Sequence, residues 1–163
     1  MYLTPRFFAL WIALVLLIGL GYAVPLMFVV GRWMLGAFCL LLLLDMALLY
    51  HRTGIQAWRM MSERFSNGDD NEVDIRVESQ YPFSVRLQII DEIPPIFQRR
   101  DVLFKLRLLR REGKKVRYAL RPTVRGTYSF GHIRVFAQSP LGLLQRRFTL
   151  GTHCDVKVYP SYL

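Results

Sequence analysis

Two long apolar runs at the start of the sequence constrain the fold of this chain more than any other feature. Residues 7–31 carry no charged side chain, and residues 33–50 carry one, Asp45. Each run is close to the ~20 apolar residues that a membrane-spanning helix needs. Arg32 separates the two runs. The sequence therefore predicts a transmembrane helical hairpin over residues 1–52, with spans at about 3–21 and 32–50 and a tight turn between them.

The arginines near the ends of the two spans set the expected orientation. Positively charged residues accumulate on the cytoplasmic side of membrane helices. Arg6 precedes the first span, Arg32 lies between the spans, and the second span is followed by Arg52, Arg59 and Arg64. We therefore expect the N-terminus and everything after residue 51 on the cytoplasmic side. A cleavable signal peptide is the alternative for the first run, because small residues occur near its end.

Asp45 is the most informative single residue, because an ionisable side chain inside a span is costly and marks a functional hypothesis. It lies about 6–9 Å from the expected cytoplasmic end of the span at 1.5 Å per residue. Arg6, at the cytoplasmic end of the first span, is a possible partner. Structural pairing or snorkelling to the interface is one interpretation, and recognition of a partner helix is the other.

After the apolar runs, the sequence changes from helical periodicity to strand alternation. Residues 53–70 indicate a juxtamembrane connector that first continues the helix, with Ile55, Trp58 and either Met61 or Met60 on one face, and then breaks at an acidic turn. From residue 71 to residue 152, short alternating segments are separated by turn residues with no helix between them. This pattern is typical of an all-β, immunoglobulin-like antiparallel sandwich. The expected strands lie at 73–77, 85–89, 104–108, 116–120, 128–137, 143–150 and 156–159, so that residues 153–163 are either a terminal strand or the start of a further C-terminal domain.

The segment 104–120 alternates on both sides of a Glu-Gly turn and is expected to form a hairpin. Its outward positions would place five basic side chains on one face: Lys105, Arg107, Lys115, Arg117 and Arg121. This basic stripe is either a solvated face, a docking surface for an acidic protein, or a contact with anionic lipid. Nucleic acid is disfavoured as a partner, because exposed aromatic residues are not interleaved with the basic ones.

The motifs that carry catalysis are absent from the sequence. It contains no phosphate-binding glycine loop, nucleophile elbow or HExxH helix, and its three histidines are not at ligand spacing from one another or from a cysteine. The acidic stretch 67–72 is not followed by the glycine and the distal glutamate at the positions that a helix-loop-helix calcium loop requires. We therefore expect neither an enzyme nor a resident cofactor or metal. Cys39 and Cys154 are expected to pack as free thiols.

One stretch of the sequence resembles a bacterial membrane-protein family. Its features are an arginine–proline pair, an Arg-Gly-x-Tyr motif, a further glycine, and a small-Pro-x-Gly-Leu turn before two arginines. In this chain they are Arg121, Pro122, Arg125, Gly126, Tyr128, Gly131, Ser139, Pro140, Gly142 and Leu143, followed by Arg146 and Arg147. In order and spacing these motifs resemble the family known as domain of unknown function 58, whose members are often encoded beside MoxR-type AAA+ ATPases.

The resemblance extends over nearly the whole chain and implies a multi-pass protein of the bacterial cytoplasmic (inner) membrane. It implies a non-enzymatic scaffold or adaptor that works with a MoxR-type ATPase in assembling or activating other complexes. Family members continue into a von Willebrand factor A-like domain, which would begin where this sequence ends. The Asp-x-Ser-x-Ser motif of that domain is absent here, so its metal-dependent function is not carried over.

Two other functions remain open on the sequence alone. In the first, the spans do the main work, and the protein is a small membrane subunit of a transporter or secretion complex. In the second, the basic stripe makes the protein an anionic-lipid-binding module. The family motif itself is expected to be structural, because Gly126 would open a strand, Gly131 would permit a bulge or a close approach, and Pro140 with Gly142 would turn the chain.

Overall fold

The computed structural model describes residues 2–51, 54–97, 103–151 and 153–160. The chain forms two compact units. Unit 1 comprises residues 1–53 together with 138–146, and unit 2 comprises residues 54–137 together with 147–163. Two N-terminal helices are therefore followed by a β-sandwich, as the sequence predicts, but a short piece of the later sequence belongs with the helices.

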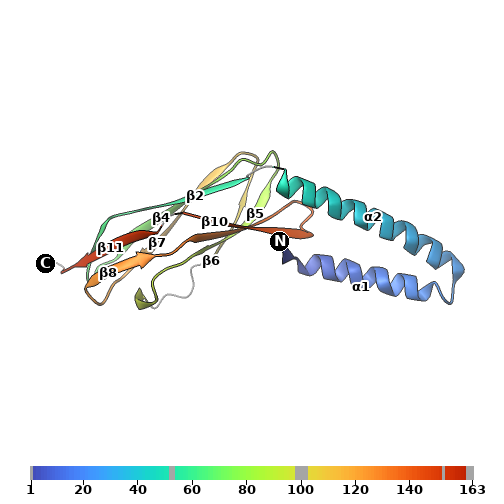
Figure 1. Ribbon diagram of the computed structural model, residues 1–163, viewed down its shortest axis with the longest axis horizontal. Helices are drawn as coiled ribbons and strands as arrows, with labels where there is room; N and C mark the ends of the chain where they lie inside the picture. The colour runs from blue at the N-terminus through green and yellow to red at the C-terminus, as the bar shows by residue number, and fades with distance from the viewer. Residues whose placement is uncertain (1, 52–53, 98–102, 152, 161–163) are drawn as a thin grey trace. The chain divides into compact units, whose positions relative to one another are not determined.

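Unit 1 is built on two apolar helices that lie side by side (Figure 1). α1 (Pro5–Leu20) begins after Thr4, whose hydroxyl accepts a hydrogen bond from the Phe7 amide at 3.4 Å. This is the usual N-cap arrangement, with proline at the first helical position. α2 (Pro25–Tyr50) also begins with proline. A two-residue strand, β1 (Tyr2–Leu3), precedes α1.

The turn between the helices lies earlier than the sequence suggests. It occupies residues 21–24, so Arg32 lies within α2 and does not separate two spans. The physical reason is that Gly31 is a contact residue and not a helix breaker. A Cβ at this position would come within 2.7 Å of Ile18 Cγ1 in α1, and small residues let two apolar helices approach closely.

The helices expose most of their apolar side chains. Trp33 is 74% exposed, Leu26 67% and Leu16 64%. Between the helices, Phe7, Trp11 and Phe38 form a small aromatic cluster with ring centroids 5.5–6.3 Å apart. By length and composition, α2 is the described helix that could cross a membrane, whereas the 16-residue α1 is shorter.

Unit 2 is an all-β sandwich whose strands bury alternate side chains. In β4 (Asn71–Ser79), Val73, Ile75 and Val77 are fully buried, and in β5 (Val85–Asp91), Val85, Leu87 and Ile89 are buried in the same way. This period of two places one face of each sheet on a shared core. The remaining strands are β2 (Ile55–Met61), β3 (Arg64–Ser66), β6 (Leu103–Leu108), β7 (Gly113–Leu120), β8 (Gly126–Phe130), β9 (Ile133–Gln138), β10 (Leu144–Leu150) and β11 (Cys154–Tyr159). The last residue of β9 and the first three residues of β10 belong to unit 1.

The strands of the described residues form three hydrogen-bonded sheets. One has the order β2-β4-β7 and another β3-β11-β8, in which β11 pairs parallel to β3 and antiparallel to β8. In the third sheet β10, β9, β5 and β6 are neighbours, and β1 pairs with the first residues of β10. β11 is therefore a strand of the sandwich, which is one of the two interpretations given above for residues 153–163.

The helical continuation expected within residues 53–70 is wrong. Residues 55–61 form β2, which pairs antiparallel with β4 from Ile55↔Ser79 to Met61↔Val73. The inward positions of β2 include Ile55, Ala57 and Arg59. The arginine interrupts the alternation of apolar and polar residues by which a strand is recognised in a sequence. The expected domain boundary between residues 52 and 53 lies outside the described residues.

The single strand expected at 128–137 is two strands. β8 and β9 belong to different sheets and are separated by Gly131 and His132. The Gly131 amide donates to the Glu92 carbonyl at 2.9 Å, and a Cβ on Gly131 would come within 2.7 Å of the Glu92 Cβ. This glycine permits a close approach, which is one of the two roles expected for it.

Candidate functional site

The candidate site is built around Asp45, which is fully buried within unit 1. Its carboxylate accepts a hydrogen bond from the Ser139 hydroxyl. It also accepts the backbone amides of Leu143, at 3.1 Å, and Leu144, at 2.8 Å. The Ser139 oxygen in turn accepts the Gly142 amide at 3.0 Å. The loop of residues 139–144 is thereby folded around one carboxylate, and we call this arrangement the Asp45 site.

Both helices contact the 139–144 loop or the strand that follows it. The Thr4 hydroxyl, at the start of α1, is directed at the carbonyl oxygens of Gly142 (2.6 Å) and Leu143 (3.1 Å). At the other helix, Arg146 Nη1 donates to the Leu49 carbonyl at 2.6 Å. That interaction satisfies one of the carbonyls that a helix C-terminus leaves without an intrahelical partner, and places a cation where the helix dipole favours it.

The Asp45 site corrects the partner expected from the sequence. Asp45 is held by a hydroxyl and two backbone amides, whereas Arg6 is exposed. A buried carboxylate that receives several hydrogen bonds needs no cation beside it, because the donors replace its hydration. Of the two interpretations given for Asp45, these contacts favour a structural one, with a loop as the partner in place of an arginine.

The family motif divides into two parts with different surroundings. Ser139, Gly142 and Leu143 belong to the Asp45 site, and the positive φ of Gly142 (69°) makes the turn that brings the two amides to the carboxylate. The earlier part of the motif serves the sandwich. The Tyr128 hydroxyl donates to the Val124 carbonyl at 3.0 Å, a backward bond typical of tyrosine corners in β-sandwiches.

The arginine–proline pair of the motif also has a structural position. The Pro122 carbonyl accepts the Gly68 amide at 2.8 Å, and Arg121 Nε donates to the Gly68 carbonyl. Gly68 has a φ of 86°, which suits a glycine. Gly126, with a φ of 154°, is the first residue of β8, where the sequence expected a strand to open. Pro140 and Arg125 are exposed.

The five residues of the basic stripe do not share one face, because the expected 104–120 hairpin is not formed. β6 pairs with β5 and β7 with β4, so Lys105 and Arg107 lie on one sheet and Lys115 and Arg117 on another. The β7 cations are also neutralised in part. Lys115 and Arg117 both bind Asp74, and the Lys115 hydrogen bond holds the pKa of that carboxyl below its ordinary value.

A buried polar cluster lies in the sandwich core. Arg59 binds both carboxylate oxygens of Asp91, donates to the Gly131 carbonyl at 3.1 Å, and lies 4.8 Å above the Phe130 ring. The Tyr118 hydroxyl donates to the same carboxylate. Burial, reinforced by the charge of Asp91, raises the pKa of the Tyr118 phenol above its ordinary value, so the phenol stays neutral. The buried charges and the phenol of this cluster therefore have their partners inside the sandwich.

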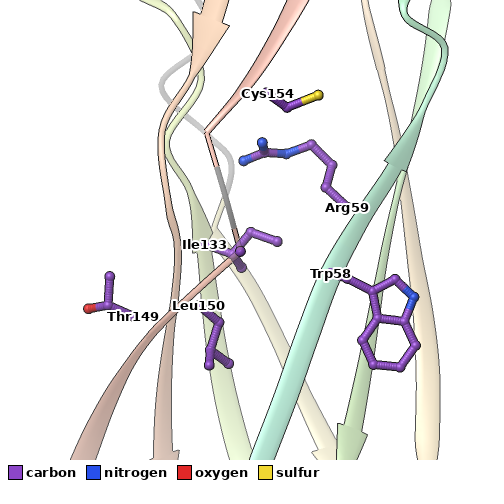
Figure 2. A pocket seen from close by; sticks show the side chains of 7 residues that line it. Trp58, Arg59, Ile133, Thr149, Leu150 and Cys154 are labelled. Atoms are coloured by element: carbon purple, nitrogen blue, oxygen red, sulfur yellow. The ribbon is translucent and has the colours of Figure 1, made fainter.

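One pocket of about 530 Å³ lies beside this cluster. Figure 2 shows the Arg59 side chain directed into it between Cys154 and Ile133. The guanidinium is already engaged by Asp91 and by a backbone carbonyl, so we assign no ligand to the pocket. The lining residues are Trp58, Arg59, Ile133, Thr149, Leu150, Gly151 and Cys154.

The histidines of unit 2 lie together although the sequence separates them. The rings of His132 and His153 are 4.6 Å apart between centroids, and His132 Nδ1 lies 3.2 Å from the Gly151 carbonyl oxygen. Within the described part of the chain, no group of three or more histidine, cysteine or acidic side chains is placed to hold a metal ion.

No family model matches the chain, and no curated protein matches it significantly. Among solved structures, the chain is similar to the CARDB domain of the PF1109 protein from Pyrococcus furiosus, with 13% identity, 66% of this chain and 94% of that chain covered, and a TM-score of 0.44. An ASH/PapD-like domain of human CEP192 is 11% identical and has a TM-score of 0.47, with 67% of this chain and 87% of that chain covered. A cohesin module from Clostridium perfringens is 8% identical and has a TM-score of 0.44, with 68% of this chain and 100% of that chain covered. At these values we draw no ligand, substrate or partner from the similar proteins.

Proposed function

We propose that this protein is a membrane-anchored scaffold or adaptor without enzymatic activity. In this proposal the helices of unit 1 cross the bacterial cytoplasmic membrane as a hairpin and hold an immunoglobulin-like sandwich at its cytoplasmic face. The observation that carries the proposal is the exposed apolar surface of α2, a 26-residue helix. Soluble proteins rarely leave large contiguous apolar patches in water, whereas a lipid bilayer covers such a surface.

The Asp45 site supports an anchor that remains part of the folded protein. A cleaved signal sequence would leave the mature chain, but Asp45 in α2 and Thr4 before α1 both bind the 139–144 loop. Loss of the helices would leave the Leu143 and Leu144 amides without their acceptor. Because Asp45 lies five residues before the end of α2, about 7.5 Å along the helix axis, the loop would sit at the cytoplasmic membrane interface.

Chain connectivity is consistent with a scaffold. The chain passes between the two units three times, at residues 53/54, 137/138 and 146/147. A domain joined to a membrane anchor is confined near one surface, which raises its effective concentration toward neighbours on that surface. By the resemblance described above, we propose that one neighbour is a MoxR-type AAA+ ATPase and that the sandwich contacts it during assembly or activation of other complexes.

Orientation is tested by cysteine labelling in bacterial spheroplasts. Tyr22, in the turn between the helices, is 99% exposed. Tyr22→Cys, in a chain carrying Cys39→Ala and Cys154→Ser, should react with a membrane-impermeant maleimide from the periplasmic side. Cys154, kept as the single cysteine, should react only after the membrane is permeabilised. Labelling in the reverse order would refute the proposed topology, and equal labelling of both sites would refute a membrane-spanning hairpin.

Partner contact is tested by photo-crosslinking in native membranes. A photoreactive phenylalanine analogue at Lys105 reports on the sandwich, and the same analogue at Leu16 reports on the exposed face of α1. The scaffold proposal expects protein crosslinks from Lys105 that include the ATPase. Protein crosslinks confined to Leu16 would instead support a membrane subunit whose helices bind other helices.

A further inference from the structure

One end of the sandwich carries all three chain connections to unit 1. Gly54, the first residue of unit 2, accepts the Gln80 amide at 2.8 Å. The strand registers Glu78↔Gly113 and Val85↔Leu108 place the turns 80–84 and 109–112 at that same end. β9 starts beside the far end of β5, where the Glu92 amide donates to the His132 carbonyl, so β9 leaves unit 2 at the tethered end. β10 is the neighbour of β9 and ends beside the start of β9, where His132 Nδ1 lies 3.2 Å from the Gly151 carbonyl oxygen, so β10 returns to unit 2 at this end as well. We call this the tethered end.

The tethered end concentrates positive charge. Arg110 and Arg111 are exposed in the turn 109–112, and Arg86 and Arg107 are directly opposite one another on β5 and β6. Like charges directly opposite in an antiparallel pair are destabilising, so the fold retains an unfavourable pair there. In the described ranges, none of these four arginines forms an ion pair with a carboxylate. The two nearby glutamates bind other cations, Glu78 with Arg76 and Glu112 with Lys114.

An exposed leucine lies beside these arginines in a well-defined turn. Leu109 is 59% exposed. Its amide donates to Glu112 Oε2 at 2.6 Å, and the Arg111 amide donates to the Tyr81 carbonyl at 3.3 Å. Arg111 has a φ of 53°, which is uncommon for a residue other than glycine. These hydrogen bonds fix a turn that presents one large apolar side chain among several cations. Such a turn suits a membrane interface, where an apolar side chain can enter the lipid and cations can bind the headgroups.

We propose that the tethered end rests on anionic phospholipid headgroups, with Leu109 inserted and Arg86, Arg107, Arg110 and Arg111 bound to the phosphates. The proposal rests on the membrane anchor proposed above. Three residues lie between Tyr50, the last residue of α2, and Gly54. The four Cα–Cα steps keep Gly54, at the tethered end, within about 14 Å of the helix end in any arrangement of the two units. The headgroup layer adds about 5–7 Å to each side of the hydrocarbon core, so the turn can reach it.

Lipid is the partner that these observations favour over an acidic protein. The chain connections hold this end near the anchor whether or not a second protein is present, and anionic lipid is the ligand always found there. Each arginine near such a surface strengthens binding by about five-fold. The charge attraction is screened beyond about 8 Å at physiological ionic strength, so the contact should weaken in high salt.

The test uses the full chain in nanodiscs of pure phosphatidylcholine or with 30% phosphatidylglycerol. An environment-sensitive fluorophore is attached at Leu109→Cys, in a chain carrying Cys39→Ala and Cys154→Ser. The matched reporter is Thr127→Cys, which is exposed on β8 and pairs with Lys157 at the opposite end of the sandwich. Quenching by spin-labelled lipid reports contact. The fluorophore at position 109 should be quenched with phosphatidylglycerol and released by 0.5 M salt, while the one at 127 should stay unquenched.

Charge variants separate a lipid contact from mere proximity. Arg110→Gln with Arg111→Gln should lower the docked-to-undocked ratio of the tethered end by about 25-fold. The control pair, Arg125→Gln with Lys157→Gln, removes the same charge elsewhere and should leave the ratio unchanged.

The outcomes distinguish this proposal from the anchor on which it rests. Quenching at position 109 that is equal in both lipids, or absent from both, in a chain that remains in the nanodiscs would refute the lipid contact alone. Salt-insensitive quenching would refute the role of the arginines. A chain that does not incorporate into either nanodisc would refute the anchor, and the lipid contact with it.

Discussion

Replacing Asp45 by leucine removes the acceptor of three hydrogen bonds and leaves a good helix-forming residue in its place. The Leu143 and Leu144 amides and the Ser139 hydroxyl then lose their partner in a buried site. Hydrogen bonds to a charged group contribute about 1.5–3 kcal/mol each. All three donors lie in the 139–144 loop. The loss of stability should therefore be local to this loop and to the helix ends that hold it.

Amide hydrogen exchange reads these bonds directly. Loss of about 1.5–3 kcal/mol of protection corresponds to roughly 10- to 150-fold faster exchange at Leu143 and Leu144. The measurement is hydrogen–deuterium exchange by mass spectrometry on the full chain in nanodiscs. Amides of β4, in unit 2, provide the internal reference and should keep their rates.

Two variants make the test specific. Asp45→Asn keeps one acceptor oxygen and should give intermediate rates. Leu44→Ala alters the neighbouring, exposed position of α2 and should leave the loop unchanged. Unchanged exchange at Leu143 and Leu144 in Asp45→Leu would refute the reasoning, because the loop would then hold its conformation without the carboxylate.

Three further predictions concern the sandwich and use denaturant unfolding of the chain in nanodiscs. Asp91→Asn should lower the free energy of unfolding by about 3–5 kcal/mol, because it leaves the buried Arg59 guanidinium without its counter-charge; a loss below about 1 kcal/mol would contradict a closed pair. Tyr118 has a raised pKa, so its proton stabilises the fold below the unfolded value of 10.0 and that stability is lost as pH rises further. Tyr118→Phe should therefore flatten the decline in stability above pH 10, and an identical decline in both proteins would contradict this origin. Gly131→Ala should lower the free energy of unfolding by about 1–3 kcal/mol, because the added Cβ would come within 2.7 Å of the Glu92 Cβ; unaltered stability would show that residues 131 and 92 can move apart at no cost.

Alternation of apolar residues was a reliable guide where the inward positions were all apolar. β4 and β5 follow the expected pattern, because Val73, Ile75, Val85 and Leu87 are all buried. β2 was missed because an arginine occupies one of its inward positions. Its partner, Asp91, lies 32 residues away along the chain, so local periodicity holds no sign that the charge is neutralised.

The sequence also does not show which strands belong to the same sheet. Two adjacent alternating segments with a tight turn between them predict a hairpin, yet β6 and β7 pair with other strands. Residues on successive strands share a face only when the strands share a sheet. The supposed stripe that included Lys105 and Arg117 therefore has no common surface.

The Asp45 site could be found only in part from the sequence. The sequence identifies Asp45 as a carboxylate within an apolar run, and it leads to the expectation of a charged partner. The actual donors are a serine and two backbone amides more than 90 residues further along the chain. Backbone amides have no sequence signature, although the Ser-Pro-Leu-Gly-Leu turn that presents them was recognised as a motif.

The 94-residue separation between Asp45 and Ser139 has a consequence for how the protein is made. At a translation rate of about 5–20 residues per second, the ribosome supplies the serine roughly 5–19 s after the aspartate. The helices are therefore complete while the loop that covers their carboxylate has not been synthesised, and formation of the Asp45 site must come late in biogenesis. A chain interrupted before residue 139 would display a bare acidic group on an apolar helix, a chemical mark by which an incomplete copy differs from a finished one.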